Sequence, residues 1–175
     1  MIEKGDPVPV ICKTKHPAHI MVLGVVGSDG QKCPLHFFEN GMRMTSKDYI
    51  KVMRTHVKPW LERAYPDGNY VFQQDGAPPH TADKSREWLK NNLSSFWDKH
   101  LWPPNSPDLN PLDYGIWGVM ESKACATPHP NLDSLRSSVA REWNNLSAEY
   151  VAKTCKSFRA RLEKVVAANG GYIEK

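Results

Sequence analysis

The chain carries the stretch YVFQQDGAPPH at residues 70–80, and this stretch decides the expected fold. Its first three residues are aromatic or β-branched, so it predicts a strand over 70–75 that Asp75 ends. A second stretch, WPPNSPDLNPLDY at residues 102–114, likewise ends in an aspartate, Asp113. The two stretches are separate in the sequence, but they can bring two carboxylates to one edge of a sheet.

Paired carboxylates at such an edge predict a site for a divalent cation. Asn110 can cap a helix that Pro111 begins, which places Asp113 in its first turn. Hard divalent cations prefer oxygen ligands, and they promote reactions of phosphate esters. Each aspartate also has a structural interpretation, because Asp75-Gly76 is a common turn signal and an acid in a first helical turn favours the helix dipole.

Residues from about 16 to 164 resemble the C-terminal catalytic region of mariner-type cut-and-paste DNA transposases. The resemblance implies an α/β fold of the ribonuclease-H-like class, with a mixed sheet flanked by helices. It also implies a parent activity of metal-dependent DNA cleavage and strand transfer. The matching phrases are HPAHIMVLG (16–24), FQQDGAPPH (72–80), WPPNSPDLNPLDY (102–114) and MESK (120–123).

The resemblance also implies the site residues. These transposases use three acids, of which the second matches Asp75 and the third matches Asp113, with 37 residues between them. Both are expected to be catalytic and to hold Mg²⁺ or Mn²⁺ in a two-metal site. His80 and Asn110 are expected close to these acids. For His80 a second interpretation stays open, in which the ring bonds to backbone near Thr81.

Two other acids near Asp113 are assigned elsewhere. Glu121 lies eight residues further along the same helix, about 12 Å away at 1.5 Å per residue, which is too far to share a site with Asp75. Asp108 is interpreted as the turn residue of the Ser-Pro-Asp-Leu-Asn run.

The first acid of the family has no clear counterpart. In the family it lies on a strand well before the segment at 16–24, and only fifteen residues precede that segment here. Glu3 and Asp6 are the candidates, and the prolines at Pro7 and Pro9 argue against a central strand around Asp6. The expectation is an N-terminally truncated catalytic domain that lacks the first central strand and the helix-turn-helix region and is inactive alone.

Loss of that strand would leave unpaired backbone groups along residues 19–26 and 70–75. Three outcomes stay open: residues 8–13 fill the gap, another chain donates a strand, or the fragment folds poorly. The expected partners are therefore DNA and either a second copy or a strand-donating chain. The alternative function is a non-catalytic nucleic-acid-binding or protein-interaction module derived from a transposase, and a degenerate product without a role is a third possibility.

Turn signals and periodicity predict the other elements. Asp29-Gly30 is a hairpin turn between strands at 19–26 and 33–39, of which Pro34 marks the second as an edge strand. A further short strand is expected between Phe96 and Trp102, toward its end at 100–102. Helices are expected after a capping box at Thr45 and Asp48, with Pro59 as a kink or an end, and after Thr81. Three more helices are expected from Pro111, around Leu132–Trp143 and from Ser147. The last of these ends at Gly170-Gly171, and its apolar face carries Val151, Cys155, Phe158 and Leu162.

The expected organisation is an irregular lead-in at 1–17, the partial catalytic domain at 18–126 and a helical extension of the same domain at 127–175. A net charge of +4 and a pI near 8.8 fit a nucleic-acid partner. No apolar run approaches the ~20 residues that cross a bilayer, so no membrane is expected.

The cysteines and the C-terminal basic residues complete the picture. The four cysteines are scattered without a Cys-x-x-Cys pair, which disfavours a zinc site and favours a reduced intracellular compartment. No small-molecule cofactor is expected, and a nuclear location rests on the resemblance, with the cytoplasm otherwise. Five basic side chains near the C-terminus either contact phosphates or form a solvated helix face: Lys153, Lys156, Arg159, Arg161 and Lys164.

Overall fold

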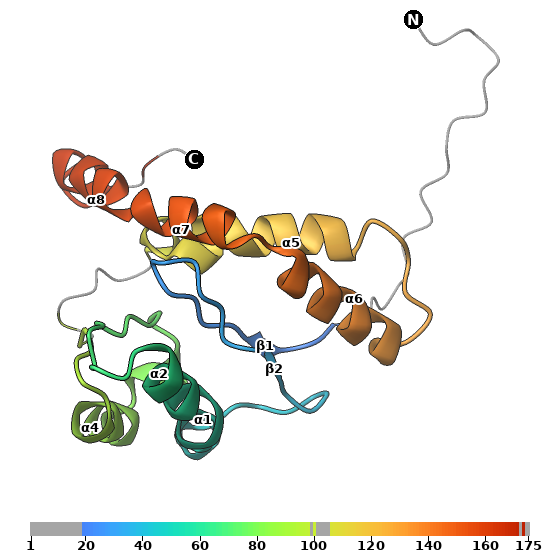
Figure 1. Cartoon of the computed structure of the whole chain (residues 1–175), viewed down its shortest axis with the longest axis horizontal. Coiled ribbons are helices and arrows are strands. Elements are labelled where there is room, and N and C mark those ends of the chain that lie inside the picture. The colour runs from blue at the N-terminus through green and yellow to red at the C-terminus, as the bar shows by residue number, and fades with distance from the viewer. Residues whose placement is uncertain (1–18, 99, 101–105, 172, 174–175) are drawn as a thin grey trace, which may run out of the picture.

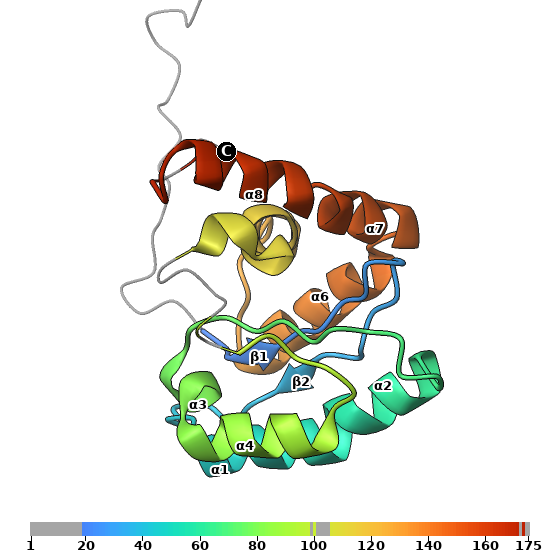
Figure 2. The ribbon, with the colours of Figure 1, turned by 90° about the vertical axis from the view of Figure 1, so that its left-hand side faces the viewer.

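The computed structural model describes residues 19–98, 100, 106–171 and 173. In it a small hairpin lies between two groups of helices, and the two views at right angles show the same separation (Figures 1 and 2). One group is α1 (Ser46–Val52), α2 (Lys58–Ala64) and α4 (Asp83–Asn92); the other is α5 (Trp117–Ala124), α6 (Leu132–Asn145), α7 (Ala148–Lys156) and α8 (Phe158–Ala167).

The hairpin pairs β1 (Val22–Leu23) with β2 (His36–Phe37) in antiparallel register. A separate bridge joins Val26 to Lys32 closer to the turn. Gly30 sits in that turn at φ +95°, a conformation that glycine adopts without a steric penalty. The predicted hairpin is therefore confirmed, although its regular ladder is shorter than the strands expected at 19–26 and 33–39.

The strand expected over 70–75 is wrong as a regular element. Phe72 alone makes a parallel bridge, to Phe96. Its amide donates to the carbonyl of Ser95, and its carbonyl accepts from the amide of Trp97, both at 2.9 Å. A ladder needs partners along its length, and among the described residues no strand lies on the other side of this segment.

Of the short strand expected between Phe96 and Trp102, the described residues show only a single β-bridge. The pairing that exists in this region is made by Phe96, and His100 is described outside any strand. Residues 101 and 102 lie outside the described residues.

The first helix begins as predicted. The amide of Asp48 donates to the hydroxyl of Thr45 at 3.4 Å, and the amide of Thr45 donates to the Asp48 carboxylate at 3.0 Å, which completes the capping box. Pro59 does not end the helical path, which continues to Ala64. A π-helical turn, η1 (Met53–Val57), precedes α2, so that Pro59 falls in the first turn of α2, where proline is accepted.

Thr81 does not cap α4, contrary to the prediction. The pair Pro78-Pro79 starts a separate short helix, α3 (Pro78–Thr81), because proline suits a first helical turn. Thr81 therefore ends α3, and Ala82 occupies the cap position of α4. Ser85 and Leu89 of α4 and the following Leu93 are buried, and Trp88 packs against the same core.

Two hydrophobic cores lie on the two sides of the hairpin. The first joins α1, η1, α2 and α4 around Tyr49, Met53, Val57, Leu61, Phe72 and Leu89. The second joins the helices after residue 110 around Ile116, Met120, Trp143, Leu146 and Val151.

A lysine and a tryptophan attach the hairpin to the end of α6. The ammonium group of Lys32 donates to the carbonyls of Trp143 at 2.7 Å, of Asn144 at 3.1 Å and of Leu146. The indole N–H of Trp143 donates to the carbonyl of Cys33 at 2.9 Å. A cation at a helix C-terminus satisfies the last carbonyls, so Lys32 fixes α6 against the hairpin.

The C-terminal helix is divided, where the sequence predicted one element. Ser147 caps α7 as expected, but Ser157 separates α7 from α8, and its hydroxyl donates to the carbonyl of Thr154 at 2.7 Å. The break turns α8, so Leu162 is 36% exposed and Val165 is buried in its place. Gly170, at φ +81°, ends α8 as predicted. No helix among the described residues is long and apolar enough to span a bilayer.

Candidate active site

Asp75 lies in the loop between the Phe72 bridge and α3, with one carboxylate oxygen held by the protein. Its Oδ1 accepts from the amide of Ala77 at 2.9 Å and from Nδ1 of His80 at 2.5 Å. The first contact is the turn that the Asp75-Gly76 pair predicted. Its Oδ2 accepts no hydrogen bond from the described part of the chain, and the side chain is 48% exposed. One oxygen is thus fixed while the other stays open to a ligand.

Asp113 lies in the first turn of the helix after Asn110, as predicted. The amides of Asp113 and Tyr114 both donate to the carbonyl of Asn110 at 2.9 Å. The side-chain oxygen of Asn110 accepts from the amide of Leu112 at 3.1 Å, which caps the helix. This turn is a π-helical segment, η4 (Leu112–Ile116), a geometry that is frequent at functional sites.

The two carboxylates affect each other. Desolvation by the surrounding protein raises the pKa of Asp113, and the negative charge of Asp75 raises it further, while a hydrogen bond from Asn110 opposes both. Desolvation also raises the pKa of Asp75, but the hydrogen bond and charge of His80 and the Ala77 amide outweigh it, so the pKa is lowered overall. The charge of Asp75 therefore acts on Asp113 in the folded chain.

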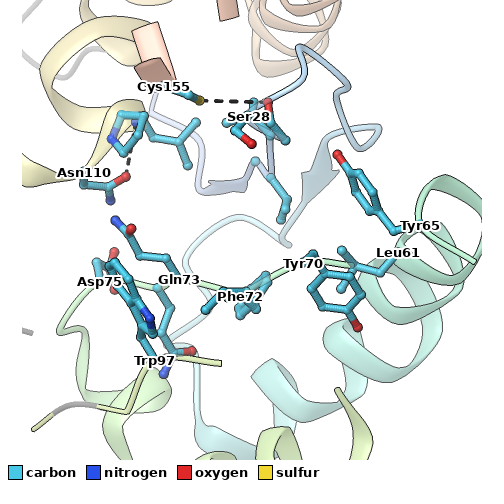
Figure 3. A pocket seen from close by; sticks show the side chains of 18 of the residues that line it. Ser28, Leu61, Tyr65, Tyr70, Phe72, Gln73, Asp75, Trp97, Asn110 and Cys155 are labelled. Carbon is cyan, nitrogen blue, oxygen red and sulfur yellow. Dashed lines mark hydrogen bonds between the residues drawn. The ribbon is translucent and has the colours of Figure 1, made fainter. Parts of the chain in front are cut away.

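A pocket of about 650 Å³ is lined by Asp75 and by residues 110–112, which directly precede Asp113. Residues 23–28 of the hairpin line one side, and residues 68–75 line the other. Figure 3 shows Asp75, Gln73 and Asn110 grouped at one end of this pocket, with Phe72, Tyr70 and Tyr65 along its length. The pocket thus lies between the segments 19–26 and 70–75, which were expected to flank a missing central strand.

The backbone along one side of this pocket is open. Phe72 uses its amide and its carbonyl on the Phe96 side, so the alternation of a strand turns those of Val71 and Gln73 toward the pocket. Within the described ranges, neither of these two amides has an acceptor. The side chain of Val71 is also 54% exposed, which is unusual for a residue in the middle of an α/β domain.

His80 is in contact with Asp75, so the interpretation as a bond to backbone near Thr81 is wrong. Its ring is 7% exposed and lies against the ring of Tyr49, with centroids 4.2 Å apart. The Tyr49 hydroxyl donates to Gln74 Oε1 at 2.7 Å, and Gln74 Nε2 donates to the carbonyl of His80 at 3.1 Å. Tyr49 and Gln74 were not predicted as site residues. In the sequence, Tyr49 shows only the helical periodicity of a core position.

The donor set suits a hard cation but is incomplete in the described residues. No group of three or more histidine, cysteine, aspartate or glutamate side chains placed to hold a metal occurs there. Asp75 and Asp113 supply carboxylate oxygens, and a cation between them would relieve the repulsion that raises the pKa of Asp113. The weak candidates for a first acid, Glu3 and Asp6, lie outside the described residues.

The other acids lie away from this pair. Asp108 lies in a 3₁₀ turn, η3 (Pro107–Leu109), as the turn interpretation expected. Glu121 is exposed on α5 and does not line the pocket.

The basic residues near the C-terminus lie on the surface of α7 and α8. Four of them are exposed: Lys153, Lys156, Arg159 and Lys164. The fifth, Arg161, places its guanidinium over the ring of Tyr114, 4.2 Å from the centroid. Arg161 therefore belongs to the packing of α8 against η4, whereas the other four are exposed and Arg159 pairs with Glu163 at 3.2 Å.

Residues 1–136 match a family model described as DDE superfamily endonuclease. The Tc3 transposase of Caenorhabditis elegans is 27% identical over 88% of this chain, and the Tc1 transposase of the same organism is 30% identical over 70%. The matched parts are 45% and 43% of those proteins, so the chain spans less than half the length of these relatives.

Among solved structures, the Mos1 mariner paired-end complex with Mn superposes with a TM-score of 0.84 at 21% identity, over 99% of this chain and 51% of that one. This likeness confirms the expected ribonuclease-H-like fold.

Proposed function

This chain belongs to the DDE superfamily endonuclease family, and from that premise we propose that it is part of the catalytic domain of a cut-and-paste DNA transposase of the Tc1/mariner kind. The substrate is DNA, and the reaction is cleavage and transfer of its strands. Action on DNA also implies a nuclear location. The observation that carries the proposal is the position of Asp75 and Asn110 at one end of the pocket, with Asp113 in the helical turn that Asn110 caps.

Asp75 and Asp113 are the residues that hold the divalent cation, magnesium or manganese. Support comes from the open Oδ2 of Asp75 and from Asp113, whose pKa is raised by desolvation and then by the charge of Asp75, so that a cation would favour its ionised form. When bound, such an ion neutralises charge on a phosphodiester and favours the deprotonated form of the attacking hydroxyl. Asn110 orients Asp113 by capping the helix in whose first turn Asp113 lies.

A further extended segment completes this site by entering the pocket between residues 23–28 and 68–75. The open amides of Val71 and Gln73 support this proposal, because an added strand gives them acceptors by β-augmentation. That strand would end beside Asp75 and can carry the first acid, which has no counterpart among the described residues. It comes from the part of the same protein before residue 19, which includes residues 8–13 and lies outside the described residues, or from a second chain. The site cleaves DNA only when this strand is in place.

A non-catalytic DNA-binding module is the second candidate. The four exposed basic residues on α7 and α8 favour it, because Lys and Arg side chains bind phosphates without any metal. The two candidates differ in their need for the carboxylates: the transposase needs Asp75 and Asp113, and the binding module needs neither.

Binding of Mn²⁺, followed by the electron paramagnetic resonance signal of the free ion, tests the proposal on the full chain. Asp75→Asn and Asp113→Asn each remove one charged ligand, so each is expected to weaken binding by about tenfold or more. Asp67→Asn is the matched control, since Asp67 is exposed in a turn away from the site. Equal affinity in all four proteins would refute the metal site.

A nicking assay on supercoiled DNA with Mn²⁺ tests the chemistry directly. Any cutting should depend on Asp75, so it should disappear in Asp75→Ala. Cutting that survives this substitution would rule out the assigned site, and salt-sensitive DNA binding without metal binding would favour the module.

A further inference from the structure

We propose that His80 is a positioning residue, which holds the carboxylate of Asp75 through Nδ1 so that Oδ2 stays available to the cation, and that Tyr49 and Gln74 hold His80 in turn. This inference deepens the proposed function and rests on it, because it takes Asp75 to be a metal ligand. It adds three side chains that act through Asp75 and do not touch the substrate.

The contact between His80 and Asp75 is the first step. Nδ1 of His80 lies 2.5 Å from Oδ1 of Asp75, and the Ala77 amide donates to the same oxygen at 2.9 Å. Two donors on one oxygen fix the rotation of the carboxylate, since rotation would break both bonds. The second oxygen then keeps a constant direction without a partner among the described residues. A ligand held in this way loses little freedom when it binds an ion.

The support behind His80 is the second step. Tyr49 is 1% exposed on α1, and its ring lies at 38° to the ring of His80 with centroids 4.2 Å apart. Its hydroxyl donates to Gln74, and the Gln74 amide donates to the backbone carbonyl of His80. The contacts run in a closed path from α1 through residues 74 and 75 to α3, so the ring of His80 can neither flip nor withdraw without breaking one of them.

The protonation pattern of the ring is the third step. Nε2 of His80 is buried and has no hydrogen-bond partner in the described part of the chain. A proton on Nε2 would leave a buried donor unpaired and would point the lone pair of Nδ1 at a carboxylate oxygen. The geometry therefore selects the tautomer with its proton on Nδ1, which is the one that can hold Asp75.

Residues between the two side chains produce this contact. Pro78 and Pro79 start α3, and the amide of His80 donates to the carbonyl of Ala77 at 2.9 Å. This turn returns the chain so that residue 80 lies over residue 75. Loss of a group that orients a metal ligand commonly weakens metal affinity by ~10–100-fold, which sets the size of the expected effect.

Three substitutions separate positioning from packing. His80→Phe keeps a ring against Tyr49 but has no donor, and we expect Mn²⁺ affinity to fall by ~10–100-fold with little change in Tm. His80→Asn places an amide nitrogen near the position of Nδ1 and should retain Mn²⁺ affinity to within about threefold of the wild type, well short of that loss. His80→Gln places its amide nearer the position of Nε2 and should behave like His80→Phe. Mn²⁺ affinity that is the same in all three variants would overturn the proposal.

A nuclear magnetic resonance measurement keeps the inference testable apart from metal binding. Nitrogen-15 shifts of His80 in the metal-free full chain should show a protonated Nδ1 and an unprotonated Nε2. Asp75→Asn replaces the carboxylate by a weaker acceptor, so the Nδ1 proton should move upfield. A proton on Nε2, or no response to Asp75→Asn, would overturn the positioning role. If the wild type binds no Mn²⁺, the proposed function fails, and these shifts still decide whether His80 holds Asp75.

Discussion

The carboxylate of Asp75 raises the pKa of Asp113, although 37 residues separate the two in the sequence. One lies in a loop after a single β-bridge, and the other lies in the first turn of a π-helical segment. His80 bonds to Asp75, whereas no described basic side chain acts on the pKa of Asp113. The pair therefore carries an excess of negative charge that a divalent cation can neutralise.

Removing the charge of Asp113 should stabilise the fold at neutral pH. Its pKa is raised on folding, so its contribution to stability is present below the ordinary value of 3.8 and is lost as pH rises through the folded pKa. We expect Asp113→Asn to raise Tm at pH 7 by about 1–2 °C, since partly exposed charges contribute less than ~1 kcal/mol in a chain of this size. Thermal unfolding at pH 7 and near pH 3 measures the effect, which should vanish at the lower pH.

Asp75 should show the opposite sign. Its pKa is lowered on folding, so its stabilising contribution is present above 3.8 and is lost as pH falls through the folded pKa. Asp75→Asn should therefore lower Tm at pH 7 and have less effect in acid. A Tm that rises in both variants at pH 7 would contradict the assignment of His80 as the partner of Asp75.

Amide hydrogen exchange should reveal the open edge along the pocket. The amide of Phe72 is bonded to Ser95 and should exchange slowly, whereas those of Val71 and Gln73 have no described acceptor and should exchange quickly. An extended upstream segment, fused to the chain or added as a peptide, should then protect Val71 and Gln73. Equal protection of all three amides in the chain alone would show that their acceptors are already present.

Two glycines in neighbouring helical turns should respond to alanine in opposite ways. A Cβ on Gly115 would lie 2.5 Å from Cγ2 of Thr154, so we expect Gly115→Ala to destabilise by ~1–3 kcal/mol in urea unfolding. A Cβ on Gly118 meets nothing within 4 Å, so Gly118→Ala should stabilise by up to ~1 kcal/mol. Thr154→Ser removes Cγ2 and should recover most of the loss in Gly115→Ala, which distinguishes the clash from a general effect on the helix.

The four exposed basic residues of α7 and α8 should contribute to DNA affinity without sequence preference. Alanine at Lys153, Lys156, Arg159 and Lys164 should reduce the slope of log affinity against log salt by ~0.9 for each DNA phosphate that the protein no longer neutralises. Fluorescence anisotropy with a labelled duplex at several salt concentrations measures this slope. Alanine at Lys84 and Lys90, which are exposed on α4, is the matched control. An equal reduction of the slope in this control would show that DNA does not bind preferentially at α7 and α8.

Local rules of the sequence predicted much of this structure. The capping box at Thr45 and Asp48, the turn at Gly30, the cap at Asn110 and the position of Asp113 in a first turn all depend on contacts within four residues. Such contacts form wherever the residue types occur at the correct spacing, so the sequence alone was enough to place them.

The sequence also determined the family and the two acids, because YVFQQDGAPPH and WPPNSPDLNPLDY carry both at fixed spacing. Only the tertiary structure decided what surrounds those acids. The segment 70–75 forms only one bridge because a regular ladder needs partner strands. His80 contacts Asp75 through a turn, and Tyr49 on another helix packs against the His80 ring. The break at Ser157 changes the direction of α8. These features depend on groups far apart in the chain, and their energies appear only when the helices and the hairpin are packed together.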